Sequence, residues 1–177
     1  MIIGLYGKSG SGKTTACVFF EKKGFFIVNA DKIGHEVLTK ELITEAFGEE
    51  YVDRKKLGKL VFSDKAELNK LNSITKPLIE DRIISLIKEH ENTVVDGAIL
   101  QNTKIVDYCD ITVLIRSKNI LERIMKRDNL TEIDALNRIN SQIISEKADI
   151  IIDNDESIDE LYIKLNEVIK HGKKTSI

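Results

Sequence analysis

The feature that most constrains this chain is a glycine-rich turn close to its first residue. The apolar run Ile2–Tyr6 has the length of a buried strand and leads into Gly7-Lys8-Ser9-Gly10-Ser11-Gly12-Lys13-Thr14. This spacing matches the pattern G-x-x-x-x-G-K-[ST], in which glycines let successive backbone N–H groups point at a phosphate. A helix predicted over Thr15–Lys23 directs its positive dipole end at the same point. The pattern therefore predicts a strand, a phosphate-binding loop and a helix, and the alternative is a Gly- and Ser-rich surface loop.

Two polar side chains of the predicted loop have roles that follow from their chemistry. The ammonium of Lys13 can reach the β and γ phosphates of a nucleoside triphosphate, and the Thr14 hydroxyl can bind Mg²⁺. We therefore predict that ATP and Mg²⁺ bind here. The predicted nucleotide-binding residues of the loop are Lys8, Ser9, Gly10, Ser11, Gly12, Lys13, Thr14 and Thr15.

Composition limits the partners of the chain. With 177 residues, 42% apolar and 32% charged, it has the size of one compact α/β core with a small appended lobe. A net charge of -2 gives no general attraction to nucleic acid or to an anionic membrane, and no apolar run approaches the roughly 20 residues that span a bilayer. After the core residues are assigned, no long apolar stripe remains that could form a subunit interface. We expect a cytoplasmic monomer that acts on a small molecule, with reduced, buried thiols at Cys17 and Cys109.

Four further β-branched or aromatic runs alternate with helical patterns along the chain. Because each strand is followed by a helix, the pattern predicts an α/β fold with a five-stranded parallel sheet and right-handed crossovers. The four runs are Phe25–Val28, Thr93–Asp96, Ile111–Ile115 and Ala148–Ile152. A last helix follows the fifth strand, and its core-facing residues are predicted to be Leu161, Leu165, Val168 and Ile169.

Two acidic residues follow predicted strands directly. Asp31 comes just after the second strand, and Asp96 ends the third. In open α/β sheets ligands bind beyond the carboxyl ends of the strands, so both residues are expected at the edge that carries the phosphate loop. Asp31 is either a catalytic group or only the N-cap of a helix over Lys32–Leu38. Asp96 is either a metal-linked carboxylate or a structural residue.

The segment between the second and third strands is longer than a simple crossover requires. From Lys32 to Glu91 the pattern is helical almost throughout, which predicts an added helical lobe that binds the substrate. Pro77, the only proline, is expected to kink a helix or to begin a new one.

A basic run follows the fourth strand, and we predict a helix over Ser117–Arg127. Arg116–Arg127 contains five basic residues and one acid, and then comes the turn Asp128–Thr131 and a polar helix that bears Arg138 and Gln142. Such a run is usually a solvated helix face, but this one is placed where a mobile lid could close over phosphates.

Taken together, these residues resemble dephospho-CoA kinases over most of the chain. The resemblance implies a phosphate-loop kinase core (1–31, 92–115 and 148–172), a helical CoA-binding lobe (32–91) and a lid (about 116–147). It also implies transfer of phosphate from MgATP to the ribose 3′-hydroxyl of dephospho-CoA. Besides Gly7–Thr15 the motifs are Asn29–Ile33, Phe47-Gly48, Asp53–Phe62, Ile74–Ile79, Arg127-Asp128, Arg138-Ile139 with Gln142, and Ile151–Asn154.

The resemblance also implies roles for individual residues. Asp31 would receive the proton of the 3′-hydroxyl, Lys13 would act on the transferred phosphate, and Thr14 would hold Mg²⁺. Arg127 and Arg138 would be the cations of the lid, and Asn154 would lie beside the adenine.

The sequence departs from the family pattern after the third strand. The family has Pro-Leu-Leu followed by an acid there, whereas this chain has Asp96-Gly97-Ala98-Ile99-Leu100-Gln101. Two alternatives therefore stay open, namely a kinase of another nucleoside, nucleotide or small metabolite, and a nucleotide-binding protein without transfer activity.

Overall fold

A computed structural model describes residues 1–97, 100, 103–142 and 144–174. The chain forms two compact units, of which the first comprises Met1–Asn29 with Leu86–Ile177 and the second Ala30–Ser85. The loop, the sheet and the basic run belong to the first unit. Among the described residues, no helix combines the length and the apolarity that a bilayer crossing requires.

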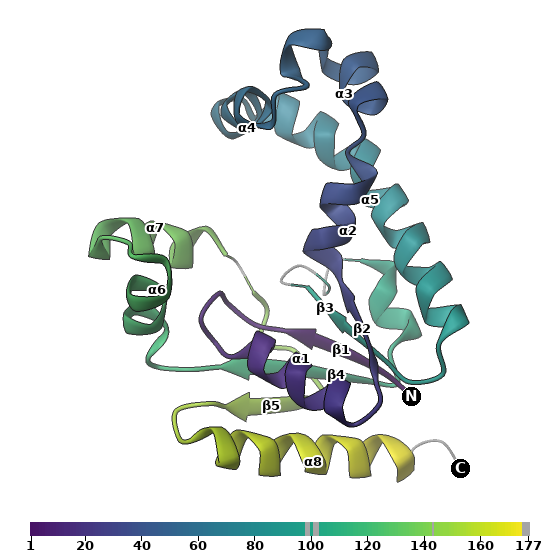
Figure 1. Ribbon diagram of the computed structural model, residues 1–177, viewed down its shortest axis with the longest axis vertical. Coiled ribbons are helices and arrows are strands. Elements are labelled where there is room, and N and C mark those ends of the chain that lie inside the picture. The colour runs from purple at the N-terminus through teal and green to yellow at the C-terminus, as the bar shows by residue number, and fades with distance from the viewer. Residues whose placement is uncertain (98–99, 101–102, 143, 175–177) are drawn as a thin grey trace. The chain divides into compact units, whose positions relative to one another are not determined.

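The first unit is built on a parallel sheet with the order β2-β3-β1-β4-β5 (Figure 1). Every neighbouring pair of strands is parallel, which confirms the predicted α/β fold. Because the strands run in one direction, their carboxyl ends share one edge of the sheet. The strands are β1 (Ile2–Tyr6), β2 (Phe26–Asn29), β3 (Thr93–Asp96), β4 (Ile111–Arg116) and β5 (Ile150–Asp153).

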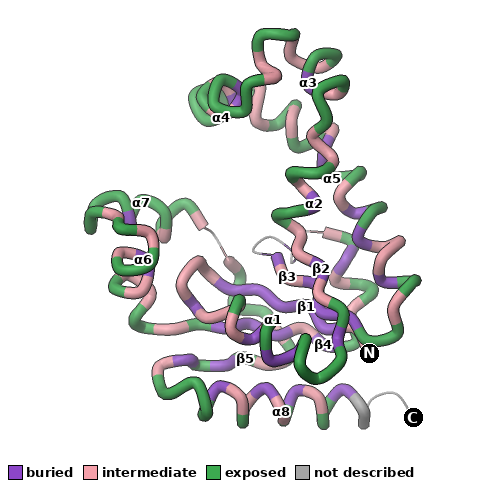
Figure 2. Tube along the Cα trace, in the orientation of Figure 1, coloured by how far each residue is buried: buried purple, intermediate pink, exposed green. Residues whose placement is uncertain are grey.

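Two helices cover one face of this sheet. The core contains Phe20 of α1 (Lys13–Lys22) and Leu165 of α8 (Ile158–Lys174), packed with inward side chains of the strands. In Figure 2 the central strands are buried, whereas α8 alternates buried and exposed residues, as its predicted amphipathic pattern requires. The short 3₁₀ helix η3 (Lys104–Tyr108) precedes β4 and buries Ile105.

A helical hairpin follows β4. It consists of α6 (Ile120–Asp128) and α7 (Glu132–Ser141), whose Ile124 and Ala135 are buried. The helix predicted from residue 117 begins only at Ile120, because Asp155 accepts hydrogen bonds from the Ser117 hydroxyl (3.0 Å) and the Lys118 N–H (2.7 Å). These bonds hold the first residues of the basic run in a turn.

The second unit is helical, as expected for an appended lobe. Its small core joins Ile43, Leu57 and Val61. Its elements are α2 (Ala30–Val37), α3 (Lys40–Phe47), η1 (Glu49–Tyr51), α4 (Arg54–Ser63) and α5 (Lys65–Glu89) as far as Ser85.

The helix α5 continues through Pro77 as one element of 25 residues. The interpretation of Pro77 as the start of a new helix is therefore wrong. Proline removes one backbone hydrogen bond, but packing of an apolar face provides most of a helix's stability in proteins. Ile83 and Ile87, which lie about two and three turns beyond the proline, are both buried.

Candidate active site

The loop between β1 and α1 has the backbone geometry that its glycines permit. Gly7, Gly10 and Gly12 all have positive φ angles, of 153°, 80° and 111°. A side chain at Gly7 would overlap the Ile115 carbonyl, and one at Gly12 would overlap the Asn154 amide. Glycine is therefore required at both positions by conformation and by space.

Two polar side chains of the loop, those of Lys13 and Ser11, bear on phosphate binding. The Lys13 ammonium donates to the Gly7 carbonyl at 2.8 Å and to the Lys8 carbonyl at 3.5 Å, so the charge lies over the turn. The Ser11 hydroxyl is buried and has no hydrogen-bond partner among the described residues. A buried donor of this kind beside a fixed ammonium fits a loop that binds phosphate oxygens. Thr14 and Thr15 lie in the first turn of α1.

Asn154 connects the loop to the end of β5. Its side-chain amide donates to the Ser11 carbonyl at 2.7 Å, and its backbone N–H donates to the Arg116 carbonyl at 2.8 Å. Its own carbonyl accepts from Arg123 at 3.0 Å. The residue predicted to lie beside the adenine is thus buried and fixes the position of the phosphate loop. Arg123 is a contact that we did not predict, although it belongs to the basic run.

A pocket of about 480 Å³ lies at the carboxyl ends of β4 and β5. Its lining includes both sequence neighbours of Asn154, namely Asp153 and Asp155. Arg116 donates to Asp153 at 2.5 and 3.3 Å, and this hydrogen bond lowers the pKa of the Asp153 carboxyl. The lining residues are Arg116, Ser117, Lys118, Asp153, Asp155 and Glu156.

The predicted metal ligands supply oxygen atoms of the kind that Mg²⁺ prefers. Asp96 pairs in register with Leu5 of β1, so its carboxylate ends the strand next to the one that leads into the loop. It accepts a hydrogen bond from the Asn29 amide at 3.3 Å. Burial raises the pKa of the Cys17 thiol of α1, and the charge of Asp96 is close enough to that thiol to help raise it. Cys17 lies one turn after Thr14, so the carboxylate lies against the first turns of α1. Among the described residues, no group of three or more His, Cys, Asp or Glu residues is arranged to hold a metal ion.

The α6–α7 hairpin contacts the loop through Ser9. Arg127 donates to the Ser9 hydroxyl at 3.1 Å, and the Ser9 N–H donates to the Gln142 side chain at 2.7 Å. Arg127 and Arg138 both donate to the Asp128 carboxylate, at 2.7 and 2.6 Å. The two predicted cations are therefore brought together, and one of them lies at the phosphate loop.

Two predicted features are not among the described residues of the first unit. Asp31 is an exposed residue in the first turn of α2 and belongs to the second unit, so its role remains a prediction from the sequence. Ala98, Ile99 and Gln101, which replace part of the family's Pro-Leu-Leu motif, lie outside the described residues.

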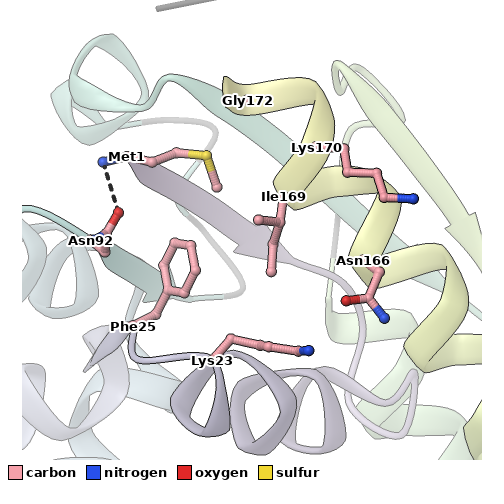
Figure 3. Close-up of a pocket in the computed structure, with 8 residues that line it drawn as sticks. All are labelled: Met1, Lys23, Phe25, Asn92, Asn166, Ile169, Lys170 and Gly172. Atoms are coloured by element: carbon pink, nitrogen blue, oxygen red, sulfur yellow. Dashed lines mark hydrogen bonds between the residues drawn. The ribbon is translucent and has the colours of Figure 1, made fainter. Parts of the chain in front are cut away.

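A second pocket, of about 500 Å³, lies away from these groups (Figure 3). Met1 and Asn92, which line it, precede β1 and β3 and so mark the amino edge of the sheet, opposite the loop. Its charged groups already have partners. The Met1 ammonium donates to the Asn92 side chain at 3.3 Å, Lys170 donates to Glu167 at 2.7 Å, and the Lys23 ammonium lies 5.6 Å from the centre of the Phe19 ring. We therefore place the chemistry at the loop.

Comparison with known proteins shows the family to which the chain is similar. The family model described as dephospho-CoA kinase matches residues 1–160. A dephospho-CoA kinase of Lactobacillus acidophilus is 35% identical over an alignment of 191 residues that covers 95% of each chain.

Solved structures show the same similarity. A dephospho-CoA kinase from Campylobacter jejuni has a TM-score of 0.61 and 28% identity, with 97% of this chain and 96% of that chain covered. The Thermus thermophilus protein TT1252 has a TM-score of 0.79 and 24% identity, with 97% of each chain covered, which supports the fold. On the sequence match and the loop geometry together, this chain belongs to the dephospho-CoA kinase family.

Proposed function

We propose that this protein transfers the γ-phosphoryl group of ATP to the ribose 3′-hydroxyl of dephospho-CoA, giving coenzyme A and ADP. Family membership over residues 1–160 supports the acceptor. The observation that carries the proposal is the contact of Arg127 with Ser9, which brings a cation of the α6–α7 hairpin to a loop shaped for phosphate.

The donor side follows from the loop. Its backbone N–H groups and the Lys13 ammonium hold the β and γ phosphates, and the N-terminal end of α1 adds its positive dipole. Thr14 and Asp96 would hold Mg²⁺, which neutralises charge on the phosphate oxygens when it is bound. The pocket beside Asn154 would receive the adenosine part of the nucleotide.

Transfer through a loose transition state requires mainly alignment and charge neutralisation. We assign neutralisation of the equatorial oxygens to Arg127 and Arg138, because they are the two predicted cations that the hairpin carries beside the loop. Residues of about 116–147 would then act as a lid that excludes water while the phosphoryl group moves.

The acceptor side rests on the second unit and on Asp31. We infer that this helical unit holds the CoA part of the acceptor and that the Asp31 carboxylate accepts the 3′-hydroxyl proton as the oxygen attacks. A carboxylate in this role contributes roughly 10² to 10⁴ in rate.

The test is ADP release by the purified protein with MgATP and dephospho-CoA, compared with other nucleosides, nucleotides and small metabolites. We expect turnover to depend on dephospho-CoA and Mg²⁺, and Asp31→Asn to lower kcat roughly 10²- to 10⁴-fold. The control is Asp81→Asn, an exposed acid of α5 in the same unit, which should leave kcat unchanged.

Each other outcome has a defined meaning. Selective use of a nucleoside monophosphate would replace the acceptor that we propose. ATP binding without turnover of any acceptor would contradict a kinase, and full activity of Asp31→Asn would remove Asp31 from the mechanism.

We also infer that the enzyme works as a monomer in the cytoplasm on this small molecule. The net charge of -2 supports independence from nucleic acid and from anionic membranes.

A further inference from the structure

Asp128 forms a bridge between the two arginines of the hairpin. Arg127 donates from Nε to Asp128 Oδ1 and from Nη2 to Oδ2, both at 2.7 Å. Arg138, ten residues later on α7, donates from Nη1 to the same Oδ2 at 2.6 Å. One carboxylate thus holds two like-charged groups that would otherwise repel each other.

Stability of the hairpin does not explain this arrangement. Asp128 is the last residue of α6, where the helix dipole disfavours a negative charge. The Arg127 and Arg138 side chains are 50% and 46% exposed and the Asp128 side chain is 25% exposed, so solvent screens both cations and weakens what the two ion pairs contribute to folding. A carboxylate at this position is therefore better explained by what it does to the arginines.

We propose that Asp128 is a positioning residue that holds Arg127 and Arg138 as one two-cation group beside Ser9 of the phosphate loop, ready for the transferring phosphoryl group. This inference rests on the proposed function, because it assigns the two arginines to that group. It adds a residue that contacts neither ATP nor the acceptor and acts only through the arginines.

The bonding pattern leaves donors for the phosphate. Among the described residues, Arg127 uses Nε and Nη2 and Arg138 uses Nη1, so Nη1 of Arg127 and Nε and Nη2 of Arg138 remain available. The hydrogen bond from Arg127 lowers the pKa of the Asp128 carboxyl, so the bridge stays charged at neutral pH. Arg127 also bonds to Ser9, which fixes the pair against the loop.

The first experiment compares Asp128→Asn with the parent protein in steady-state kinetics. The amide has the same shape but no charge, so the arginines lose their common counter-ion. We expect kcat to fall roughly tenfold to a hundredfold, part of the 10³ to 10⁵ that such an arginine can contribute, with less than about a threefold change in KM for ATP. Asp128→Glu keeps the charge and should restore part of kcat.

The second experiment tests whether Asp128 acts through the arginines. In a background of Arg127→Ala with Arg138→Ala, we expect Asp128→Asn to change kcat less than about twofold. Glu132→Gln removes an acid of α7 that contacts neither arginine and serves as the control with unchanged kcat.

A third measurement needs no acceptor. In the ¹⁵N–¹H spectrum of the parent protein, the Nε–H signal of Arg127 should be protected from exchange by its bond to Asp128, and Asp128→Asn should remove that protection. Absence of turnover with dephospho-CoA in the parent protein would refute the proposed function. An Arg127 Nε–H that exchanges freely in the parent protein would refute the bridge itself.

Three kinetic results would also overturn the proposal. They are an unchanged kcat in Asp128→Asn, a raised kcat, which would make Asp128 a restraint, and an equal loss when both arginines are absent.

Discussion

At the scale of single residues, Gly12 carries the strictest requirement. Its φ of 111° is costly for any residue with a Cβ, and that Cβ would overlap the Asn154 amide that holds the loop. We expect Gly12→Ala to weaken ATP binding at least about tenfold, because the Asn154–Ser11 hydrogen bond must break or the loop must move. Isothermal titration calorimetry with MgATP measures this.

Gly24→Ala is the control for Gly12→Ala, because it introduces backbone strain without an overlap between the new Cβ and a neighbouring atom. Gly24 has a φ of 86°, but a Cβ there would meet nothing within 4 Å. It should cost about 1 kcal/mol of stability and leave ATP affinity unchanged. Equal ATP affinities of the two variants would show that the contact with Asn154 does not shape the loop.

At the scale of elements, two glycines of the second unit should respond to alanine with opposite signs. Gly58 lies inside α4, and the nearest atom to an added Cβ is an ordinary 3.9 Å away, so Gly58→Ala should stabilise the helix by about 0.5–1 kcal/mol. Gly48 ends α3 with a φ of 105°, so Gly48→Ala should destabilise by a similar amount. Thermal denaturation followed by circular dichroism measures both, and a lower Tm for Gly58→Ala would contradict this account of α4.

At the scale of the whole molecule, the two free thiols report on opening of the first unit. Cys17 and Cys109 are half-buried, and not fully buried as predicted, because Cys17 lies at the border of the core and Cys109 lies in the connection that leads into β4. Burial raises the pKa of both Cys17 and Cys109 from 9.0 to about 12. The folded chain holds these protons more tightly than the unfolded chain, so their contribution to stability is complete below about pH 8 and is lost as the pH rises from about 9 towards 12.

At pH 8 we therefore expect iodoacetamide to label both thiols at least about a hundredfold more slowly in the native protein than in urea. Mass spectrometry of the labelled peptides gives each rate separately. Rapid labelling of Cys17 in the native state would contradict its place against Asp96.

The sequence predicted the features that depend on local spacing. The phosphate loop, the five strands and the apolar face of α8 follow from patterns that span a few residues, and the structure has all three. The features that were missed depend on distant partners. The late start of α6 depends on Asp155, and the Asp128–Arg138 bond exists because a hairpin folds α7 back on α6. The helix α5 continues through Pro77 because of packing, which the helix propensity of proline does not measure.

The hydrogen bond from Asn154 to Ser11 joins positions 143 residues apart. During synthesis on the ribosome, the glycine-rich turn emerges well before the amide that fixes its shape. Nascent chains interrupted between the two would therefore hold nucleotide poorly. Tight ATP binding thus becomes a mark that synthesis has passed residue 154.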